Sequence, residues 1–381
     1  MIHLCLMSTP STPSSTRRFI GLMSGTSLDG VDAVVVAQSG ETFTQTGQHF
    51  LPYPDTVRQT LLALHVPAHN ELHTASIMAN TLADLYASAV HQLLDKYALA
   101  ANSITAIGCH GQTIRHCPDL PDGQAYTLQL GNHARLAELT GITVIGDFRS
   151  RDIAAGGQGA PLVPAFHQAV FASPDQHRVI INIGGIANLS DLPCHGTIAG
   201  FDSGPGNLLL DAWTQQHTGQ TYDAGGTWAA SGKVNTALLQ SMLSDPYFSL
   251  PPPKSTGRDL FNSAWLTQHL YSFADTPVNI ARTLVALTAR SITNAVAQYC
   301  TGVDEIYLCG GGAHNQLLLS EIRQLCTCPV HLTDTLGVGV DWVEAVAFAW
   351  LAQRTTDGQP GNIPGVTGAH DDRILGAIYP K

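Results

Sequence analysis

Small, hydroxyl-bearing and acidic residues alternate in the stretch GLMSGTSLDGVDAVVV, residues 21–36. The apolar runs at its two ends predict strands, and the residues between them are more than a hairpin turn requires. Glycine lets a backbone approach an anion, and successive N–H groups in such a turn form an anion-binding concavity. Asp29 and Asp32 would repel a phosphate group unless a divalent cation lies between them. The pattern favours a magnesium nucleotide site; the alternative is an ordinary hairpin with a long turn.

Two later turns are also rich in glycine. They lie in INIGGIANLS and LCGGGAHN and contain Asn182, Gly184, Gly185, Gly310, Gly311 and Gly312. The first turn could hold the same polyphosphate from its other side, and the second could lie against a base or ribose. The alternatives are a plain hairpin and close helix–strand packing. No GxxxxGK[ST] occurs and no GxGxxG opens a helix after the first strand, so a P-loop and a dinucleotide fold are disfavoured.

Asp202 in FDSGPGN is the candidate catalytic residue. The pattern predicts a strand that ends near Asp202, a Gly-Pro-Gly turn and a helix that starts near Asn207. Open α/β sheets place their ligands at the carboxyl ends of strands, and an aspartate there can serve as general base for water or a hydroxyl group. Such a base only needs to be ionised at the working pH. The alternative is an aspartate that caps a helix or stabilises a turn.

Four other polar residues are candidates for substrate binding. His110 in GCHGQT and Asp147 in IGDFRSRD follow predicted strands and could contact sugar hydroxyls, or be polar turn residues. Arg149 could pair with a substrate carboxylate or with nearby aspartates. Glu344 lies in a mostly apolar predicted helix, where an acid usually has a partner or a ligand.

The elements that must position these residues alternate between strands and helices, which predicts an α/β fold. Helical periodicity is clearest at 76–99 and 275–300, and the second helix is expected to be capped by Asp275 or Thr276. A glycine-rich hairpin stands near the start of each half, at 21–36 and 178–190. The two hairpins predict two related domains that face a shared cleft. We also expect the loops 154–161 and 251–259 to act as hinge or lid.

Composition narrows the function classes. The chain has 381 residues, 44% hydrophobic and 12% charged, which is typical of a folded enzyme with two domains. A formal charge of -11 argues against a nucleic-acid or anionic membrane surface, and no apolar run reaches the roughly 18 residues of a membrane helix. The eight cysteines are scattered, so we expect free thiols and a cytoplasmic protein. Residues 1–17 are expected to be a disordered extension in which Met7 is a second possible start.

Eight motifs together make the chain resemble the anhydro-N-acetylmuramic acid kinase family from about residue 18 to its end. In chain order they are FIGLMSGTSLDGVDAV, AIGCHGQTIRH, VIGDFRSRDIAAGGQGAPLVPAFH, INIGGIANLS, DSGPGNLLLDAW, PKSTGRDLFN, CGGGAHN and VEAVAFAWLA. The resemblance is specific because all eight motifs occur in the family's order.

The resemblance implies a two-domain actin-like ATPase fold, related to ribonuclease H, with ATP in a central cleft. It implies that the ATP phosphate loop consists of Gly25, Thr26, Ser27, Leu28, Asp29, Gly30, Val31 and Asp32. Asp202 would be the catalytic base and Glu344 a sugar-site residue. The first strand departs from the superfamily at Met23, where an aspartate is usual. We expect its acidic role to move to Asp29 or Asp32, with Asp29 as the candidate Mg²⁺ ligand.

The implied activity is ATP-dependent phosphorylation of 1,6-anhydro-N-acetylmuramic acid with hydrolysis of the anhydro ring, in peptidoglycan recycling and amino sugar catabolism. Two alternatives stay open: a plain sugar kinase without ring hydrolysis, and a nucleotide-switched binding module of the same fold. The expected lobes are 18–150 with about 355–381, and 151–354. The expected partners are ATP, the amino sugar and a second copy of the chain in a homodimer, with no nucleic acid and no membrane.

Overall fold

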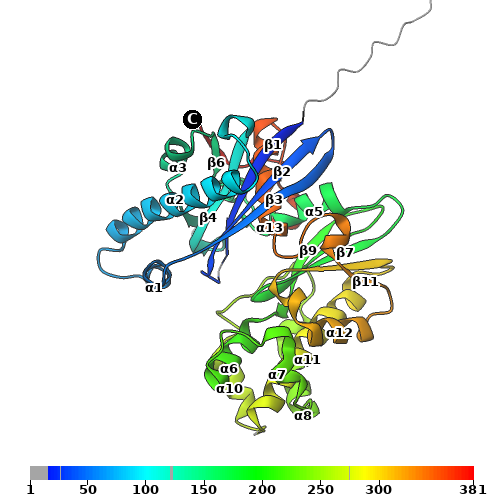
Figure 1. The fold of residues 1–381 in the computed structure, drawn as a ribbon. Helices are drawn as coiled ribbons and strands as arrows, with labels where there is room; N and C mark the ends of the chain where they lie inside the picture. The colour runs from blue at the N-terminus through cyan, green and yellow to red at the C-terminus, as the bar shows by residue number, and fades with distance from the viewer. Residues whose placement is uncertain (1–15, 26, 121–122, 274) are drawn as a thin grey trace, which may run out of the picture.

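A computed structural model of the chain describes residues 16–25, 27–120, 123–273 and 275–381. These residues form two β-sheets with helices packed around them; the first sheet combines strands of the first half with the C-terminal strand, and the second sheet comes from the second half (Figure 1). The α/β class predicted from the sequence is therefore confirmed. Most of the expected N-terminal extension and Thr26 lie outside the described residues, and the first strand already begins at Arg17.

The first sheet has the strand order β12-β6-β4-β1-β2-β3, with β5 paired to β4. Neighbours β1, β2 and β3 are antiparallel, whereas β1, β4 and β6 are parallel. The strands of this sheet are β1 (Arg17–Ser24), β2 (Gly30–Ser39), β3 (Thr42–Pro52), β4 (Ala106–Cys117), β5 (Tyr126–Leu130), β6 (Val144–Gly146) and β12 (Ala377–Tyr379).

The second sheet repeats this arrangement. Its order is β11-β10-β7-β8-β9, with β7, β8 and β9 antiparallel and β7, β10 and β11 parallel. Its strands are β7 (Arg178–Ile183), β8 (Ile186–Leu192), β9 (Ala199–Pro205), β10 (Glu305–Cys309) and β11 (Val330–Leu332). Both predicted hairpins are present, as β1–β2 and β7–β8. Two sheets of the same order and strand directions are the architecture expected of the actin-like ATPase fold, which is confirmed.

Helices cover both sheets. Those of the first half are α1 (Asp55–Leu64), α2 (Glu71–Lys96), α3 (His133–Thr140), α4 (Ser150–Ala154) and α5 (Val163–Phe171). Those that follow β9 are α6 (Leu208–Thr218), α7 (Thr227–Ala230), α8 (Thr236–Leu243), α9 (Pro246–Ser249), α10 (Ser263–Leu270), α11 (Pro277–Tyr299) and α12 (Gln316–Leu325). The last helices are α13 (Val343–Thr356) and α14 (Pro364–Thr367), and four short 3-10 helices complete the chain, η1 (Ala101–Ser103), η2 (Ala224–Gly226), η3 (Gly311–His314) and η4 (Thr333–Leu336).

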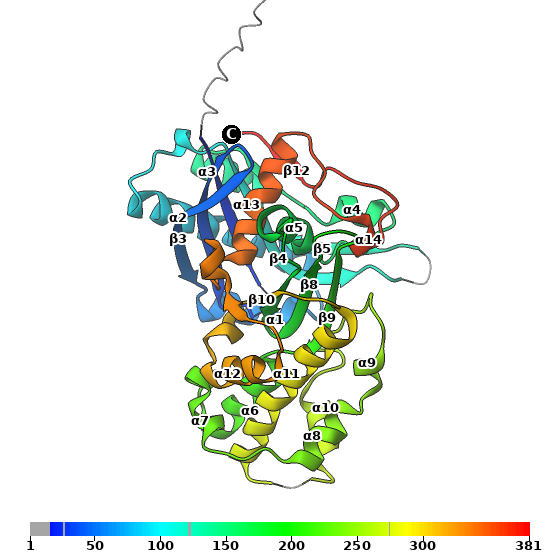
Figure 2. The same cartoon turned by 90° about the vertical axis from the view of Figure 1, so that its right-hand side faces the viewer.

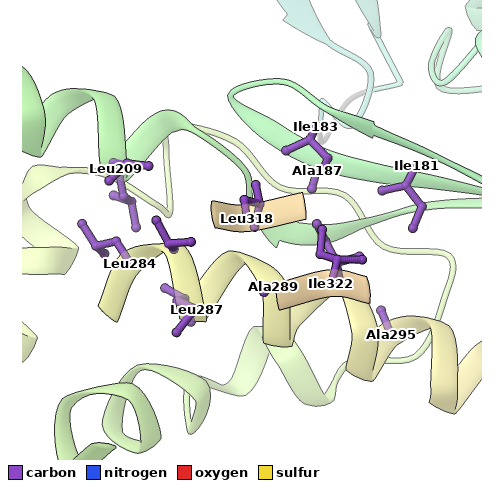
Figure 3. Packing of buried hydrophobic residues seen from close by; sticks show 14 of the residues in the cluster. Ile181, Ile183, Ala187, Leu209, Leu284, Leu287, Ala289, Ala295, Leu318 and Ile322 are labelled. Carbon is purple, nitrogen blue, oxygen red and sulfur yellow. The ribbon is translucent and has the colours of Figure 1, made fainter. Parts of the chain in front are cut away.

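The core of the second lobe lies between its sheet and the long helix α11. Ile181 of β7 and Ala187 of β8 belong to one apolar cluster with Leu284 and Leu287 of α11 and with Leu318 and Ile322 of α12 (Figure 3). Pro277 begins α11 one residue after its N-cap Thr276, one of the two caps expected from the sequence. Burial of this apolar face fixes the sheet edge that carries the glycine turns.

Helix α13 packs directly on the first sheet (Figure 2). A Cβ atom at Gly21 of β1 would clash with the carbonyl oxygen of Ala345, and one at Gly108 of β4 with that of Phe348. The apolar cluster that contains the buried side chains of α13 also includes Ile180 and Tyr307 of the second sheet. α13 therefore joins the packing of both halves, although the expected second lobe, 151–354, would include most of it. The lobe boundaries stay a prediction.

Two strands are longer than the sequence predicted. The expected turn HGQT lies inside β4, because β5 pairs with residues 112–117 and extends the strand beyond Gly111, whose φ is +75°. Likewise β9 continues to Pro205, because β8 pairs with it as far as Ile186. His110 and Asp202 therefore lie within strands rather than at their ends.

All seven described cysteines are free, as expected, and three of them are buried. Within the described ranges, no helix is both long enough and apolar enough to cross a bilayer.

Candidate active site

The turn between β1 and β2 is compact and held by its own polar groups. Leu28 has a left-handed φ of +57°, and its N–H donates to the Gly25 carbonyl at 3.3 Å. The Ser27 hydroxyl donates to Asp29 Oδ1 at 2.7 Å, and the Gln112 amide of β4 donates to the Gly25 carbonyl at 3.0 Å. Such strain in a non-glycine residue is common at ligand sites. Thr26, also expected in this loop, lies outside the described residues.

The second and third glycine turns meet. The Gly206 and Asn207 N–H groups donate to the Gly185 and Gly184 carbonyls at 2.9 and 2.8 Å, which joins the β7–β8 turn to the start of α6. A Cβ atom at Gly310 would clash with the Asn182 side chain. Sequence reasoning assigned no binding role to Asn207, whose position between these turns depends on the β9–α6 connection.

At Gly311 and Gly312, the first two residues of η3, the chain runs close to β7. A Cβ atom on Gly312 would clash with the Ile183 side chain. The nearest described atom to such a Cβ on Gly311 is Nδ2 of Asn207, at 3.9 Å. The structure therefore brings the predicted residues of these two turns next to one another.

Four carboxylates lie near one another between the two sheets. Burial and the charges of Asp29, Glu344 and Asp341 raise the pKa of Asp32 to about 8. Val340 joins this cluster to the third turn, because its carbonyl accepts from the Gly310 N–H at 2.8 Å. Asp341 was missed in the sequence analysis because no motif marks it. The cluster holds Asp32 mostly neutral at pH 7 unless a cation compensates its charge.

The acidic cluster around Asp32 is the candidate site for a nucleotide-bound cation. Among the described residues, no group of three or more His, Cys, Asp or Glu side chains has the arrangement of a metal site. Mg²⁺ beside a nucleotide is usually bound by one or two carboxylates together with phosphate oxygens and water. The acidic donors around Asp32 fit that mode. Asp29, the predicted ligand, is exposed and already accepts a hydrogen bond from Ser27.

Arg149 and His110 form a second polar group beside this cluster. The guanidinium donates from Nε and Nη2 to His110 Nε2 at 3.1 and 3.0 Å, and from Nη1 to the Gly159 carbonyl at 2.7 Å. Burial and the Arg149 charge hold the pKa of His110 well below its usual value. His110 is therefore neutral, with the proton on Nδ1. Burial also lowers the pKa of Arg149, to about 10, so the guanidinium keeps its charge at pH 7.

Glu344 and Asp147 complete the predicted substrate residues. Burial raises the pKa of Glu344, and the Arg149 charge opposes this rise. Asp147 follows β6 with a left-handed φ of +56°, a conformation that costs a non-glycine residue energy and is enriched at functional sites. Burial lowers the pKa of the neighbouring His133, and the Asp147 charge opposes this fall. His110, Arg149 and Glu344 thus form one group, and Asp147 lies in the same β6–α4 connection as Arg149.

Asp202 has its own set of partners. Its Oδ2 accepts from the Thr256 N–H at 2.9 Å, its carbonyl accepts from the Tyr247 hydroxyl at 2.8 Å, and its N–H donates to the Lys254 carbonyl at 3.0 Å. Burial raises the pKa of Asp202 to about 6, against the Thr256 hydrogen bond and the Lys254 charge. The sequence analysis asked only for an ionised carboxylate, so this rise is a new finding.

Residues 254–256 belong to the proline-rich loop. Their backbone groups also hold Asp202 in place through the Thr256 N–H and the Lys254 carbonyl. Lys254 lies over the rings of Tyr247 and Tyr299, with its Nζ 4.8 and 5.7 Å from their centroids. In the described part of the chain, no hydrogen bond joins Asp202 to the Asp32 cluster. The position of Asp202 relative to the second glycine turn is set by β8 and β9, the paired strands that connect the two.

Sequence comparison assigns the family. The family model described as anhydro-N-acetylmuramic acid kinase matches residues 17–381. This chain belongs to that family. A protein of that name from Nitrosospira multiformis is 55% identical over 95% of this chain and 98% of its own length. Another from Chromobacterium violaceum is 53% identical over 96% of this chain and 100% of its own.

The predicted resemblance is thus confirmed, and the chain is a kinase. Membership in a kinase family supports the predicted use of ATP. It also removes the alternative of a nucleotide-switched binding module. The individual site residues and Mg²⁺ stay predictions.

Solved structures give weaker likenesses. The activator of the 2-hydroxyisocaproyl-CoA dehydratase from Clostridium difficile with bound ADPNP aligns with a TM-score of 0.47 and 12% identity, over 90% of this chain and 96% of its own. A ROK family glucokinase from Streptomyces griseus in complex with glucose and AMPPNP aligns with a TM-score of 0.40 and 12% identity, over 88% and 99%. Such scores are too low to assign a ligand or a site.

Proposed function

We propose that this kinase transfers the γ-phosphoryl group of ATP to O6 of 1,6-anhydro-N-acetylmuramic acid while water opens the anhydro ring. The products are N-acetylmuramic acid 6-phosphate and ADP. The family of the chain supports the substrate, since its relatives are named for that sugar acid. A cytoplasmic role in peptidoglycan recycling and amino sugar catabolism belongs to the same proposal, as does a homodimer.

The environment of Asp202 is the observation that carries the hydrolytic step. Its carboxylate is largely enclosed, is held by the Thr256 N–H at one oxygen, and has a pKa of about 6. A general base works best when its pKa lies near the operating pH, because it is then both ionised and a good proton acceptor. A plain kinase acting on a free hydroxyl has less need of this balance, since phosphoryl transfer depends mainly on positioning and electrostatics.

The proposed reaction balances as follows. A water oxygen attacks C1, and its proton passes to the Asp202 carboxylate. The C1–O6 bond breaks with its electron pair going to O6. O6 bonds to the γ-phosphorus as the bond to the β-phosphate oxygen of ATP breaks. Ring opening supplies the nucleophile and phosphoryl transfer stabilises the leaving oxygen, so each half assists the other.

Arg149 is proposed to bind the lactyl carboxylate of the substrate. In the described structure three of its five N–H donors are used, two toward His110 and one toward Gly159. One donor on each terminal nitrogen remains, and an arginine fork binds a carboxylate through two such parallel donors. Glu344 and Asp147 are proposed to accept from the sugar's N–H or hydroxyl groups.

The nucleotide is proposed to lie between the two glycine hairpins, in a cleft between the lobes. Backbone N–H groups of residues 25–32 and of Gly184 and Gly185 would surround the phosphates, with Gly310 to Gly312 beside the base or ribose. Mg²⁺ would be held by Asp32, with Asp29 as the second candidate, and would neutralise phosphate charge when bound.

Product analysis tests this proposal. The enzyme is incubated with ATP and the anhydro sugar in oxygen-18 water, quenched within one turnover cycle, and the product is weighed by mass spectrometry. We expect a 6-phosphate that is one water heavier than the phosphorylated anhydro sugar and carries the label at C1. Preformed product in labelled water gives the background exchange. An unlabelled product that keeps the anhydro bridge would establish the plain kinase instead.

A further inference from the structure

We propose that Asp152 is a positioning residue that holds Arg149 ready for the substrate carboxylate, acting through the backbone of Gly159. The inference rests on the proposed role of Arg149. It assigns a function to Asp152, one of the two charged residues in the motif GDFRSRD that the predicted site left out.

Asp152 is a fully buried acid, with 0% of its surface exposed. Its Oδ1 accepts from Asn362 Nδ2 and from the Thr367 hydroxyl, both at 2.8 Å. Its Oδ2 accepts from the Gly159 N–H at 2.8 Å. A buried carboxylate costs free energy unless it is hydrogen-bonded, so each of these donors contributes to keeping it in place.

The two sides of the carboxylate have different consequences. The Oδ1 side ties α4 to the C-terminal segment that contains Asn362 and Thr367. The Oδ2 side fixes the peptide of Gly159, whose carbonyl accepts from Arg149 Nη1 at 2.7 Å. Asp152 thus binds the N–H of Gly159, and Arg149 binds its carbonyl. The position of that carbonyl sets the direction of the guanidinium group.

The loop that carries Gly159 is fixed elsewhere too. The Gln158 N–H donates to the Thr367 carbonyl at 2.8 Å, and the His370 N–H donates to the Ala155 carbonyl at 2.9 Å. A Cβ atom at Gly157 would clash with Asp152 Oδ2. These contacts support the loop at 154–161 from the C-terminal segment, and its expected role as hinge or lid stays a prediction.

Support of this loop matters because Arg149 has many rotatable bonds. His110 fixes the guanidinium along its Nε–Nη2 edge, and Gly159 fixes Nη1. With both contacts the remaining donors point in one direction before the substrate arrives, so less conformational entropy is lost on binding. Without the Gly159 contact, only the His110 contact orients the guanidinium.

The test compares Asp152→Asn with Thr367→Val. In Asp152→Asn the amide oxygen is expected to stay with its two donors at Oδ1, which turns the amide NH₂ toward the Gly159 N–H and removes that bond. Thr367→Val removes a hydrogen bond to the same carboxylate at Oδ1 and leaves Gly159 alone. Steady-state kinetics, sugar binding by calorimetry without ATP, and Tm are measured for both.

We expect Asp152→Asn to raise KM and Kd for the anhydro sugar on the order of tenfold, as for loss of one hydrogen bond to a charged group. KM for ATP should change less than about twofold, because the variant loses binding energy for the sugar only, equally in the ground state and the transition state. Thr367→Val should lower Tm similarly and leave both sugar constants near wild type. Equal effects of the two variants would mean that Asp152 is only structural, and would overturn the proposal.

A double-mutant cycle with Arg149→Met separates this inference from the proposed function. If Asp152 acts through Arg149, then Asp152→Asn has no further effect on sugar affinity in the Arg149→Met background. Additive losses contradict the inference alone. Unchanged sugar affinity in Arg149→Met itself contradicts the proposed carboxylate site, and the inference with it.

Gly157→Ala gives a second route if Asp152→Asn does not fold. Its added methyl group pushes Oδ2 away from Gly159 without changing any charge, and should raise KM for the sugar in the same way. Gly365→Ala is the matched control, because a Cβ atom there meets nothing closer than 3.9 Å. An unchanged sugar KM in a folded Gly157→Ala enzyme would overturn the inference.

Discussion

Asp32 lies on the opposite strand of the β1–β2 hairpin from Met23, and its carboxylate is proposed to replace the superfamily's usual aspartate. It is the register partner of Met23, the position where the superfamily usually has its aspartate. Paired residues of antiparallel strands project from the same face, so both side chains belong to the same region. The neighbouring acids and the raised pKa of Asp32 show that the folded chain without a cation holds an unfavourable concentration of charge.

Replacement of Asp32 by asparagine should therefore make the protein more stable and less active. The folded state binds a proton at Asp32 up to about pH 8, whereas the unfolded chain releases it near pH 3.8. Stability is thus lost as pH rises through that window. Asp32→Asn removes this loss, so its gain in Tm should grow from pH 4 to pH 8 and reach a few degrees. Its kcat/KM with MgATP should fall.

Thermal melts of the two proteins across that pH range check this prediction. Glu138→Gln is the control, because Glu138 is exposed and is not one of the acids that raise the pKa of Asp32, so its removal should change Tm little at any pH. A constant Tm difference between Asp32→Asn and the wild type at every pH would show that the charge of Asp32 is not the cause.

At the scale of elements, three glycine-rich turns form the proposed nucleotide site. The sequence identified all three, because glycine between apolar runs is a local signal. Their convergence depends on the β10–α12 and β9–α6 connections, which local patterns do not specify. Contacts such as Gly310 with Asn182 join residues more than a hundred positions apart.

Gly310→Ala should damage the nucleotide site more than its backbone strain explains. Gly310 and Gly302 both have φ of +81°, but a Cβ atom at Gly302 meets nothing within 4 Å. Gly302→Ala therefore measures the strain alone, on the order of 1 kcal/mol. Gly310→Ala should lower Tm further and raise KM for ATP several-fold. Equal effects of both variants on KM for ATP would contradict a role of this turn.

At the scale of the molecule, one apolar cluster spans both sheets. It contains Phe19 and Val34 of the first sheet and Ile180 of the second, with Phe166 of α5 and the length of α13 between them. The two halves therefore cannot expose their shared face independently. We expect thermal unfolding to follow one transition by circular dichroism and by tryptophan fluorescence.

Phe166→Ala tests this shared core. Phe166 is fully buried and contacts Phe171 and Trp350, so its truncation should cost about 3–5 kcal/mol and move the whole transition to lower temperature. Phe261→Ala, in the second lobe's own core, should move the same single transition. A transition that splits, with one part unchanged, would show that the lobes unfold separately.

The sequence predicted the strands and helices better than it predicted the contacts that hold the site residues in place. Hairpins and the long helices follow from periodicity and glycine, whereas β3 escaped notice because its residues alternate without a strong apolar face. Asp152 and Asn362 are 210 positions apart, and no local pattern connects them. The raised pKa of Asp202 arises from burial beneath residues 247–256, which is a property of the fold.

The account depends most on Asp202 as the base that activates water. Asp202→Asn keeps an oxygen for the Thr256 N–H and removes only the proton acceptor. Turnover of the anhydro sugar should fall at least about a hundredfold, the usual contribution of a general base, while Kd for ATP and Tm stay near the wild-type values. Retention of more than about one hundredth of wild-type turnover in this variant would contradict the account.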